Sequence, residues 1–219
     1  MSLSPNFGDR RGGVRPDMVV IHYTAMATAQ AARDRLCDPA AEVSAHWLIS
    51  EQGEALPLVP EDRRAWHAGA GGWGRVCDVN SHSIGIELAN PGDRPFPEPQ
   101  MVALEHRLSG ILHRWQIPPE RVIAHSDMAP ARKSDPGPRF DWRRLARQGL
   151  SVWPGMAEPG DFAADLGAFG YPEAAPDLLL RAFRFRFRPW ATGPRDAIDA
   201  ALAADLARRY PVDGGRRAS

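Results

Sequence analysis

The sequence predicts an α/β fold, in which helices flank a mixed central β-sheet, followed by a small all-α domain. Short β-branched and apolar runs alternate with helical patterns up to about Gly149, which is typical of α/β proteins. Two Pro-Gly pairs then mark a linker, and the residues that follow are rich in alanine and leucine. We therefore expect a first domain over residues 1–152, a linker over 153–160 and a helical domain over 161–212.

The expected strands are short and β-branched, and each is bounded by turn residues. They cover residues 18–23, 46–50, 55–59, 84–88 and 122–124. The second and third flank a glycine-containing turn and predict a hairpin. The first strand ends near His22, and the fourth ends near Glu87. Residues 60–83 form a long loop rich in glycine and tryptophan, and such loops are usually functional.

The clearest predicted helix is 98–115, because its apolar residues recur at a spacing of 3.6. Shorter helices are expected over residues 28–36 and 141–148, and another over 196–209. Between them, residues 181–188 alternate arginine and phenylalanine with a period of two. On pattern alone this alternation predicts a strand, which conflicts with the helical character of the surrounding unit.

The most informative segment is residues 125–138, HSDMAPARKSDPGP. Its three prolines exclude a long helix or a central strand, so it must be a shaped loop. Loops carry function disproportionately. A histidine and an aspartate ten positions apart, His125 and Asp135, can both reach one metal ion, with Lys133 beside them. Asp127 is a second candidate carboxylate in the same loop.

Four places end a strand or fill a loop with an ionisable side chain: His22, Glu87, His125 and the Lys133/Asp135 pair. Strand ends project toward the rim of the sheet, where sites in α/β proteins gather. Each residue alone has an ordinary structural explanation. Together, two imidazoles and one carboxylate could hold Zn²⁺ with an open fourth position. A further carboxylate could then accept a proton and a lysine could stabilise an oxyanion, which is a complete hydrolase inventory.

At this point the chain resembles a known family. The loop 125–138 is similar to that of bacterial zinc-dependent N-acetylmuramoyl-L-alanine amidases of the AmiD/AmpD type, whose fold is shared with peptidoglycan recognition proteins. Other blocks match in the family's order over roughly residues 18–150: IHYTA at 21–25, VSAHWLI at 43–49, AWHAG at 65–69 and SIGIEL at 83–88. Residues 182–189 resemble a helix of small peptidoglycan-binding modules, so we expect that segment to be helical.

The resemblance implies a role for each matching residue. The implied zinc ligands are His22, His125 and Asp135. The implied general base is Glu87, with Lys133 as its electrostatic partner at the carbonyl oxygen. The residues expected to bind substrate beside the cleft are Trp66, His67 and Trp73. Asp127 is then a loop-shaping residue rather than a ligand, and His46 a structural one.

The implied reaction is hydrolysis of the amide between N-acetylmuramic acid, or its 1,6-anhydro form, and L-alanine in peptidoglycan turnover or recycling. We expect a monomer whose partners are muropeptides. The 27 acidic and 27 basic residues balance, which argues against nucleic acid as a partner, and no apolar run approaches the ~20 residues of a membrane span. The two cysteines lack CxxC spacing and are expected as reduced thiols.

Residues 1–17 lack the apolar core of a signal peptide, so the sequence as written predicts a cytoplasmic protein, or a periplasmic one if its start is truncated. Two other functions compete with the amidase. A non-catalytic peptidoglycan-recognition module needs the fold but not the metal ligands. A non-haem iron protein can also use two histidines and one carboxylate. The presence of Glu87 and Lys133 favours hydrolysis.

Overall fold

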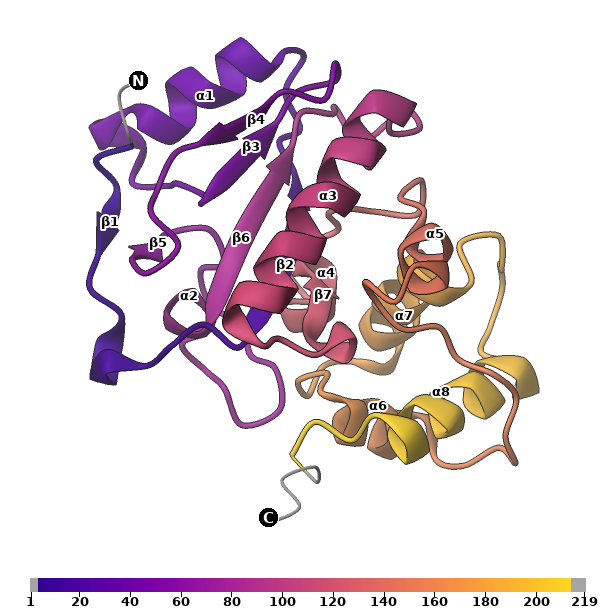
Figure 1. Cartoon of the computed structure of the whole chain (residues 1–219). Coiled ribbons are helices and arrows are strands. Elements are labelled where there is room, and N and C mark those ends of the chain that lie inside the picture. The colour runs from indigo at the N-terminus through magenta and orange to yellow at the C-terminus, as the bar shows by residue number, and fades with distance from the viewer. Residues whose placement is uncertain (1–3, 214–219) are drawn as a thin grey trace.

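The fold is a mixed sheet with helices on both faces, followed by a group of C-terminal helices (Figure 1). The computed structural model describes residues 4–213; residues 1–3, which begin the N-terminal segment considered above, and 214–219 lie outside it. The strands are β1 (Phe7–Gly8), β2 (Met18–Tyr23), β3 (Trp47–Ile49), β4 (Ala55–Pro57), β5 (Arg64–Ala65), β6 (Ser83–Leu88) and β7 (Val122–Ala124). The helices are α1 (Ala29–Cys37), α2 (Val79–His82), α3 (Glu98–Trp115), α4 (His125–Met128), α5 (Trp142–Arg147), α6 (Phe162–Phe169), α7 (Pro176–Phe187) and α8 (Ala197–Arg209).

The main sheet has five strands in the order β4-β3-β6-β2-β7. Strands β3, β6, β2 and β7 run parallel, and β4 pairs antiparallel with β3 at one edge. The predicted mixed sheet is therefore confirmed, and the β3-β4 pair is the predicted hairpin. The predicted loop 60–83 is not wholly irregular, because it contains β5, which pairs with β1, and the single-turn helix α2.

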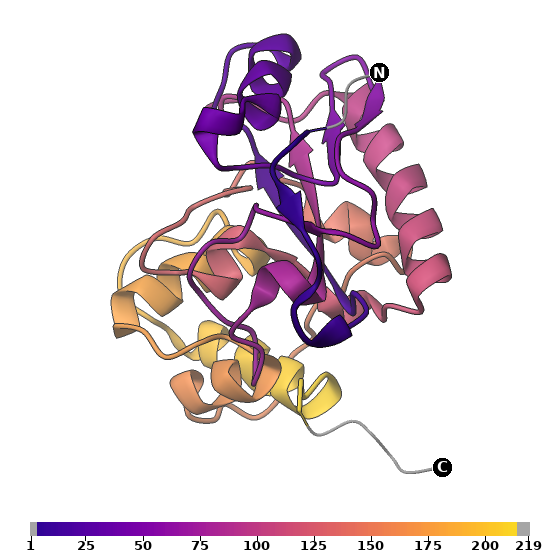
Figure 2. The same ribbon diagram turned by 90° about the vertical axis from the view of Figure 1, so that its left-hand side faces the viewer.

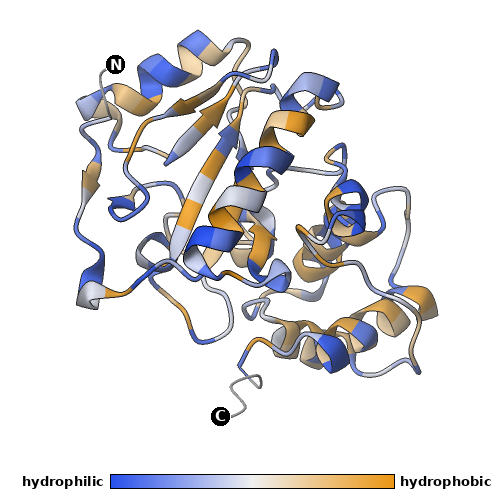
Figure 3. Ribbon diagram, viewed as in Figure 1, coloured by the Kyte–Doolittle hydropathy of each residue, from blue (hydrophilic) through white to orange (hydrophobic). Residues whose placement is uncertain are grey.

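Side-chain alternation along β2 divides the interior between the two faces of the sheet. Val19 and Ile21 point to one face, where they join the apolar residues of β6 beneath α3. The helix buries the stripe that its spacing predicts, and its hydrophobic and hydrophilic positions alternate along its length (Figure 3). Full burial of each such side chain is worth roughly 1.5–3 kcal/mol. Met18, Val20 and His22 point to the opposite face.

The second face of the sheet is covered by α1 near β3 and by the C-terminal helices near β2 and β7. Figure 2 shows α3 on one side of the sheet and the C-terminal helices on the other. One apolar cluster joins Val20 of β2 and Met128 of α4 to Phe183 and Phe187 of α7. The C-terminal helices therefore share a core with the sheet. The domain boundaries proposed at 152 and 161 stay a prediction.

Helices α6 and α8 begin after aspartates whose side chains accept from their first backbone N–H groups, whereas α7 begins with Pro176 and has no side-chain cap. Asp161 accepts from Ala164 N at 2.9 Å, and Asp196 forms a capping box with Asp199. The arginine-phenylalanine segment belongs to α7 and is a helix, as the resemblance implies and the alternation does not. Among residues 4–213, no helix is long and apolar enough to cross a membrane.

Candidate functional site

The parallel sheet brings three of the predicted site residues to the same edge. His22 of β2 lies in register with Glu87 of β6, near the carboxyl ends of both strands. On the other side of β2, Ile21 pairs with Ala124 of β7, so His125, the next residue, emerges beside His22. This arrangement arises because neighbouring parallel strands end together and the side chains of paired residues point to the same face of the sheet.

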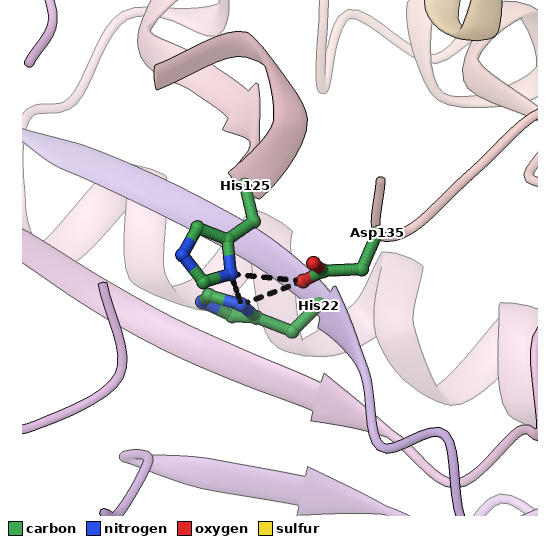
Figure 4. A group of neighbouring side chains, drawn as sticks. All are labelled: His22, His125 and Asp135. Atoms are coloured by element: carbon green, nitrogen blue, oxygen red, sulfur yellow. Dashed lines mark hydrogen bonds and ion pairs between the residues drawn. The ribbon is translucent and has the colours of Figure 1, made fainter. Parts of the chain in front are cut away.

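The predicted ligand set meets at one point (Figure 4). His22 Nδ1 and His125 Nδ1 are 2.9 Å apart, and each lies 3.0 Å from Asp135 Oδ2. His22 and His125 are 1% and 3% exposed, and Asp135 is 8% exposed. The structure thus brings together His22, His125 and Asp135 and excludes Asp127, whose carboxylate points elsewhere.

The hydrogen-bond partners of the two rings assign their tautomers. His125 Nε2 lies 2.8 Å from Ala68 O, which can only accept, so Nε2 carries the proton and Nδ1 is bare. Ser83 donates its hydroxyl proton to Val79 O at 2.5 Å, so its oxygen accepts from His67 Nε2 at 3.2 Å.

This leaves the Nδ1 atom of His67 as an acceptor, and His22 Nε2 donates to it at 3.0 Å. The Nδ1 atom of His22 is consequently bare as well. Burial, followed by the neighbouring His125, lowers the pKa of His22 to about 4, so the ring is neutral at physiological pH.

Two bare ring nitrogens and a carboxylate oxygen therefore face one another with no proton between them. Burial opposes ionisation of Asp135, and the pKa of this carboxyl falls below its ordinary value only where positive charge reaches it from the side of His125 and His22, so it is a carboxylate once a cation lies there. Three lone pairs at 2.9–3.0 Å repel unless a cation lies among them. A tetrahedral Zn²⁺ site separates its donor atoms by roughly 3.3 Å, so the three residues fit such an ion with movements of a few tenths of an ångström.

His67 reaches this centre because Gly85 leaves room for it. A Cβ at Gly85 would lie 2.4 Å from the Cγ of His67, so only glycine at this position of β6 allows the ring to pack there. Burial, followed by the nearby His22, holds the pKa of His67 well below its ordinary value, so His67 is also neutral. The sequence predicted a place beside the cleft for His67, and the structure adds that it is a hydrogen-bond acceptor behind His22.

Glu87 lies beside the three donors without a strong partner of its own. Burial, followed by the Asp135 carboxylate, raises its pKa to about 8, and Lys133 opposes the shift. Its Oε2 is buried and has no hydrogen-bond partner among residues 4–213. A cation at the neighbouring donors would lower this pKa by direct Coulomb attraction, which would restore the carboxylate as a proton acceptor.

A cavity of about 330 Å³ opens over these groups. The predicted residues that line it are His22, Trp66, His67, Glu87, His125, Lys133 and Asp135. Helix α1 and the segment after β2 form the other wall. The half-buried Lys133 ammonium makes no salt bridge or side-chain hydrogen bond within the described chain, so it is available to a ligand in the cavity.

Trp73 does not line the cavity and lies instead in the core, 1% exposed. Its ring packs against Phe169 and Tyr171 of the C-terminal region, with centroids 5.2 and 5.4 Å away. His46 is structural, as expected from the sequence: Gly85 N donates to its Nδ1 and its Nε2 donates to Arg63 O.

Sequence reasoning missed two residues that act on the site. Ser83 fixes the tautomer of His67, and no motif marks a serine at the start of a strand as functional. Arg132 lies next to Lys133 in the loop and donates to Ala68 O at 2.7 Å and Ala70 O at 2.6 Å. It thereby ties the loop to the segment that holds His125 Nε2, and its place beside Lys133 was the only available signal.

Comparison with known proteins identifies the family. The family model described as N-acetylmuramoyl-L-alanine amidase matches residues 12–138, more than half of the chain. The chain belongs to this amidase family. The matched range contains the donor set, Glu87 and Lys133, so the residues that meet at the cavity all fall within the family's own region.

Relatives extend the similarity over the whole amidase. The chain is 34% identical to N-acetylmuramoyl-L-alanine amidase AmiD of Escherichia coli, over 91% of this chain and 85% of that protein. It is 32% identical to the 1,6-anhydro-N-acetylmuramyl-L-alanine amidase AmpD of E. coli, over 65% of this chain and 87% of that one. The similarity to AmiD therefore includes the C-terminal helices.

Solved structures agree with the sequence relatives. E. coli AmiD, in complex with anhydro-N-acetylmuramic acid-L-Ala-D-γ-Glu-L-Lys, superposes with a TM-score of 0.80 at 32% identity, covering 94% of this chain and 98% of that one. AmpDh3 from Pseudomonas aeruginosa, in complex with an anhydromuramic pentapeptide, gives a TM-score of 0.81 at 32% identity, covering 92% and 94%.

Proposed function

We propose that the chain is a zinc-dependent amidase that hydrolyses the bond between N-acetylmuramic acid, or its 1,6-anhydro form, and L-alanine of peptidoglycan stem peptides. The observation that carries the proposal is the set of three bare donor atoms beside a buried carboxylate and an unpaired lysine, all lining one cavity. The relatives solved with anhydromuramyl peptides support this substrate class. We also propose muropeptides as partners of a monomeric chain.

His22, His125 and Asp135 would hold the ion, which when bound supplies Lewis acidity toward water and the scissile carbonyl. Glu87 accepts the proton of the attacking water and later gives it to the nitrogen of the leaving L-alanine. Lys133 donates a hydrogen bond to the carbonyl oxygen as that oxygen gains negative charge, which is typically worth about 3–4 kcal/mol of barrier. The products are a free lactyl carboxylate and a free amino group.

The two competing functions make different demands on these residues. A recognition module without catalysis needs no buried, unpartnered Glu87, and keeping such a carboxylate is costly. A non-haem iron site uses a similar donor set, but redox chemistry gives no role to Lys133 at the cavity wall. Both features have a use in hydrolysis, which is why we favour zinc and amide cleavage.

The test is to incubate the purified protein with ordinary and 1,6-anhydro muropeptides and to identify the products by mass spectrometry. Free stem peptide should appear with the zinc-loaded protein, disappear with a chelator and return when zinc is restored. Glu87→Gln should retain zinc and lose most turnover. Equal release of stem peptide with and without chelator would refute the metal-dependent mechanism, and no release from either substrate would refute the amidase proposal.

We also propose Trp66 and His67 as the substrate-side wall, because both line the cavity next to the donor set. Trp66 is partly exposed, so an indole face is available to a muramyl ring or to the alanyl methyl group. The Trp66→Ala variant should raise KM for muropeptides and leave the zinc content unchanged.

A further inference from the structure

The arginine-phenylalanine helix α7 reaches the loop that carries two of the three proposed metal ligands. Its contact point is Asp127, which lies two residues after His125 and is fully buried. Asp127 Oδ2 accepts from Ala124 N at 2.8 Å and from Arg186 Nη1 at 2.6 Å. Its Oδ1 accepts from the hydroxyl of Tyr171 at 2.6 Å. Two of the three donors to this carboxylate therefore come from the C-terminal region.

Arg186 is itself 1% exposed and makes further contacts on the catalytic side. Its Nη2 donates to Val122 O at 2.9 Å and to Ser151 Oγ at 3.2 Å, and its guanidinium lies 4.4 Å from the centroid of the Trp142 ring. The Arg186 side chain thus contacts β7 at Val122, α4 at Asp127 and α5 at Trp142. Hydrogen bonds from both terminal nitrogens therefore fix this buried guanidinium, although its Nε has no partner among residues 4–213.

The same loop contacts α7 at other points. Arg181 donates to Pro130 O at 2.9 Å, and Met128 and Ala129 share an apolar cluster with Phe183 and Phe187. The wall behind the loop from Asp127 to Pro130 is therefore made largely by side chains of the C-terminal region. Removing those side chains would leave the buried Asp127 carboxylate with only one of its three donors, Ala124 N.

The loop transmits this support to both ligands that it carries. Ser126 N donates to Asp135 O at 3.0 Å, so the backbone beside His125 is bonded to the backbone of the second ligand. Ala129 N donates to His125 O at 3.1 Å, and Lys133 N donates to Ala129 O at 2.9 Å. Because Asp127 lies inside this folded loop, its position sets the relative placement of His125 and Asp135.

We infer that α7 and Tyr171 form a positioning element for the metal centre, with Arg186 as its principal residue. This inference rests on the metal site of the proposed function. The C-terminal region is then part of the catalytic machinery of this chain and is not a removable substrate-binding module. Arg186 is a positioning residue, because it acts on the ligands only through Asp127.

A matched pair of variants tests the inference. Arg186→Met removes the contact to Asp127. Arg184→Met on the same helix removes another buried arginine, whose partners Asp199, Gly193 O and Pro194 O lie wholly outside the metal loop. The zinc dissociation constant is measured by competition with a chromophoric chelator, at a temperature where circular dichroism shows each variant folded.

Arg186→Met should weaken zinc binding about tenfold or more, as removal of groups that orient metal ligands does. Arg184→Met should leave the zinc Kd within about a factor of two, because it touches no residue of the loop. Both variants should lose thermal stability. An unchanged zinc Kd in Arg186→Met, or an equal weakening in Arg184→Met, would overturn the inference.

Tyr171→Phe is the second variant, in case Arg186→Met does not fold. It removes one hydroxyl from Asp127 and keeps the ring that packs against Trp73. It should also weaken zinc binding, by a smaller factor, and a wild-type zinc Kd would count against the positioning role. If the wild-type chain itself binds no zinc, the proposed cofactor fails and not the positioning element, so the two failures are distinguishable.

Discussion

Replacing Glu87 by glutamine should abolish turnover and at the same time stabilise the metal-free protein. The pKa of this carboxyl is raised from 4.5 to about 8 in the folded chain, first by burial and then by Asp135. Ionising Glu87 is therefore harder in the folded state than in the unfolded state. A neutral amide of the same shape avoids that penalty.

The difference in unfolding free energy between Glu87→Gln and the wild type should increase with pH. Below about pH 4 the carboxyl is protonated in both states, so it gives no pH-dependent difference between the two proteins. Above 4.5 the unfolded state ionises first, and the wild type loses stability relative to Glu87→Gln until the pH passes about 8. At about 1.4 kcal/mol per pKa unit, the 2.5 units between pH 4.5 and pH 7 give a difference of at most about 3.5 kcal/mol at pH 7, and about half of that where water reaches the group.

The assay is urea unfolding of chelator-treated protein at pH 4, 5.5, 7 and 8, followed by circular dichroism. The advantage of Glu87→Gln over wild type should grow steadily across this range. Glu54→Gln, at an exposed glutamate in the turn between β3 and β4, serves as the control and should show no such growth. A Glu87→Gln difference that stays flat from pH 4 to pH 8 would refute the argument that burial makes this carboxylate costly.

Three further perturbations separate the roles of the remaining groups. Lys133→Met should lower kcat about 10²- to 10³-fold with little change in zinc content, and a full kcat in steady-state muropeptide hydrolysis would remove Lys133 from the mechanism. Asp135→Ala should lose the metal, which elemental analysis after gel filtration checks; one zinc per chain would contradict the ligand assignment. His67→Leu should weaken zinc binding roughly 10- to 100-fold. His67→Asn keeps an acceptor for His22 Nε2–H and should restore much of that affinity; equal affinities in the two variants would argue against the tautomer role.

Strand and loop patterns in the sequence reduced the donor set to a few candidates, and the resemblance to the amidase family selected His22, His125 and Asp135 from them. His22 and Glu87 each stand near the end of a short apolar run, and parallel strands that end together place such residues side by side. The prolines of the 125–138 segment exclude a long helix or a central strand, and regular structure is limited to the single turn α4, so the rest of the segment can bring Asp135 back to His125. Helix α3 could also be predicted from the sequence, because its apolar stripe is long and strictly periodic.

Other features depend on packing that a local pattern does not contain. The alternation in residues 181–188 hides two pairs at i, i+4: Phe183 with Phe187, and Arg184 with Arg188. A helix uses the first pair in the core and directs both arginines to Asp199 of α8. The same residues fit both a strand, by their alternation, and a helix, by their i, i+4 pairs. Packing against the neighbouring helices stabilises the helix.

Trp73 illustrates the same limit from the loop side. Its place in a glycine-rich loop suggested that Trp73 lines the cleft, but the indole fills the space between the loop and the C-terminal region. A Cβ at Gly170 would lie 2.3 Å from the Trp73 ring, so that glycine and the tryptophan form one packing unit although nearly a hundred residues separate them. No short-range signal links these two positions.

The electrostatics of the site explain why such remote packing matters for catalysis. Bare lone pairs of His22 and His125 converge on an ionised Asp135, and a buried carboxylate stands beside them. None of these contacts is favourable without a cation, so the protein scaffold must hold the groups in place against their own repulsion. The sheet fixes His22 and Glu87 through the β2-β6 register, which is rigid by construction. The loop is not held by strand pairing, so the placement of its two ligands depends on the position of Asp127. Arg186 and Tyr171 of the C-terminal region fix that position through hydrogen bonds to the Asp127 carboxylate. A site preorganised in this way binds a cation that removes the repulsion among the donor atoms. Binding of the ion then stabilises the folded state and offsets the free energy needed to hold these groups together.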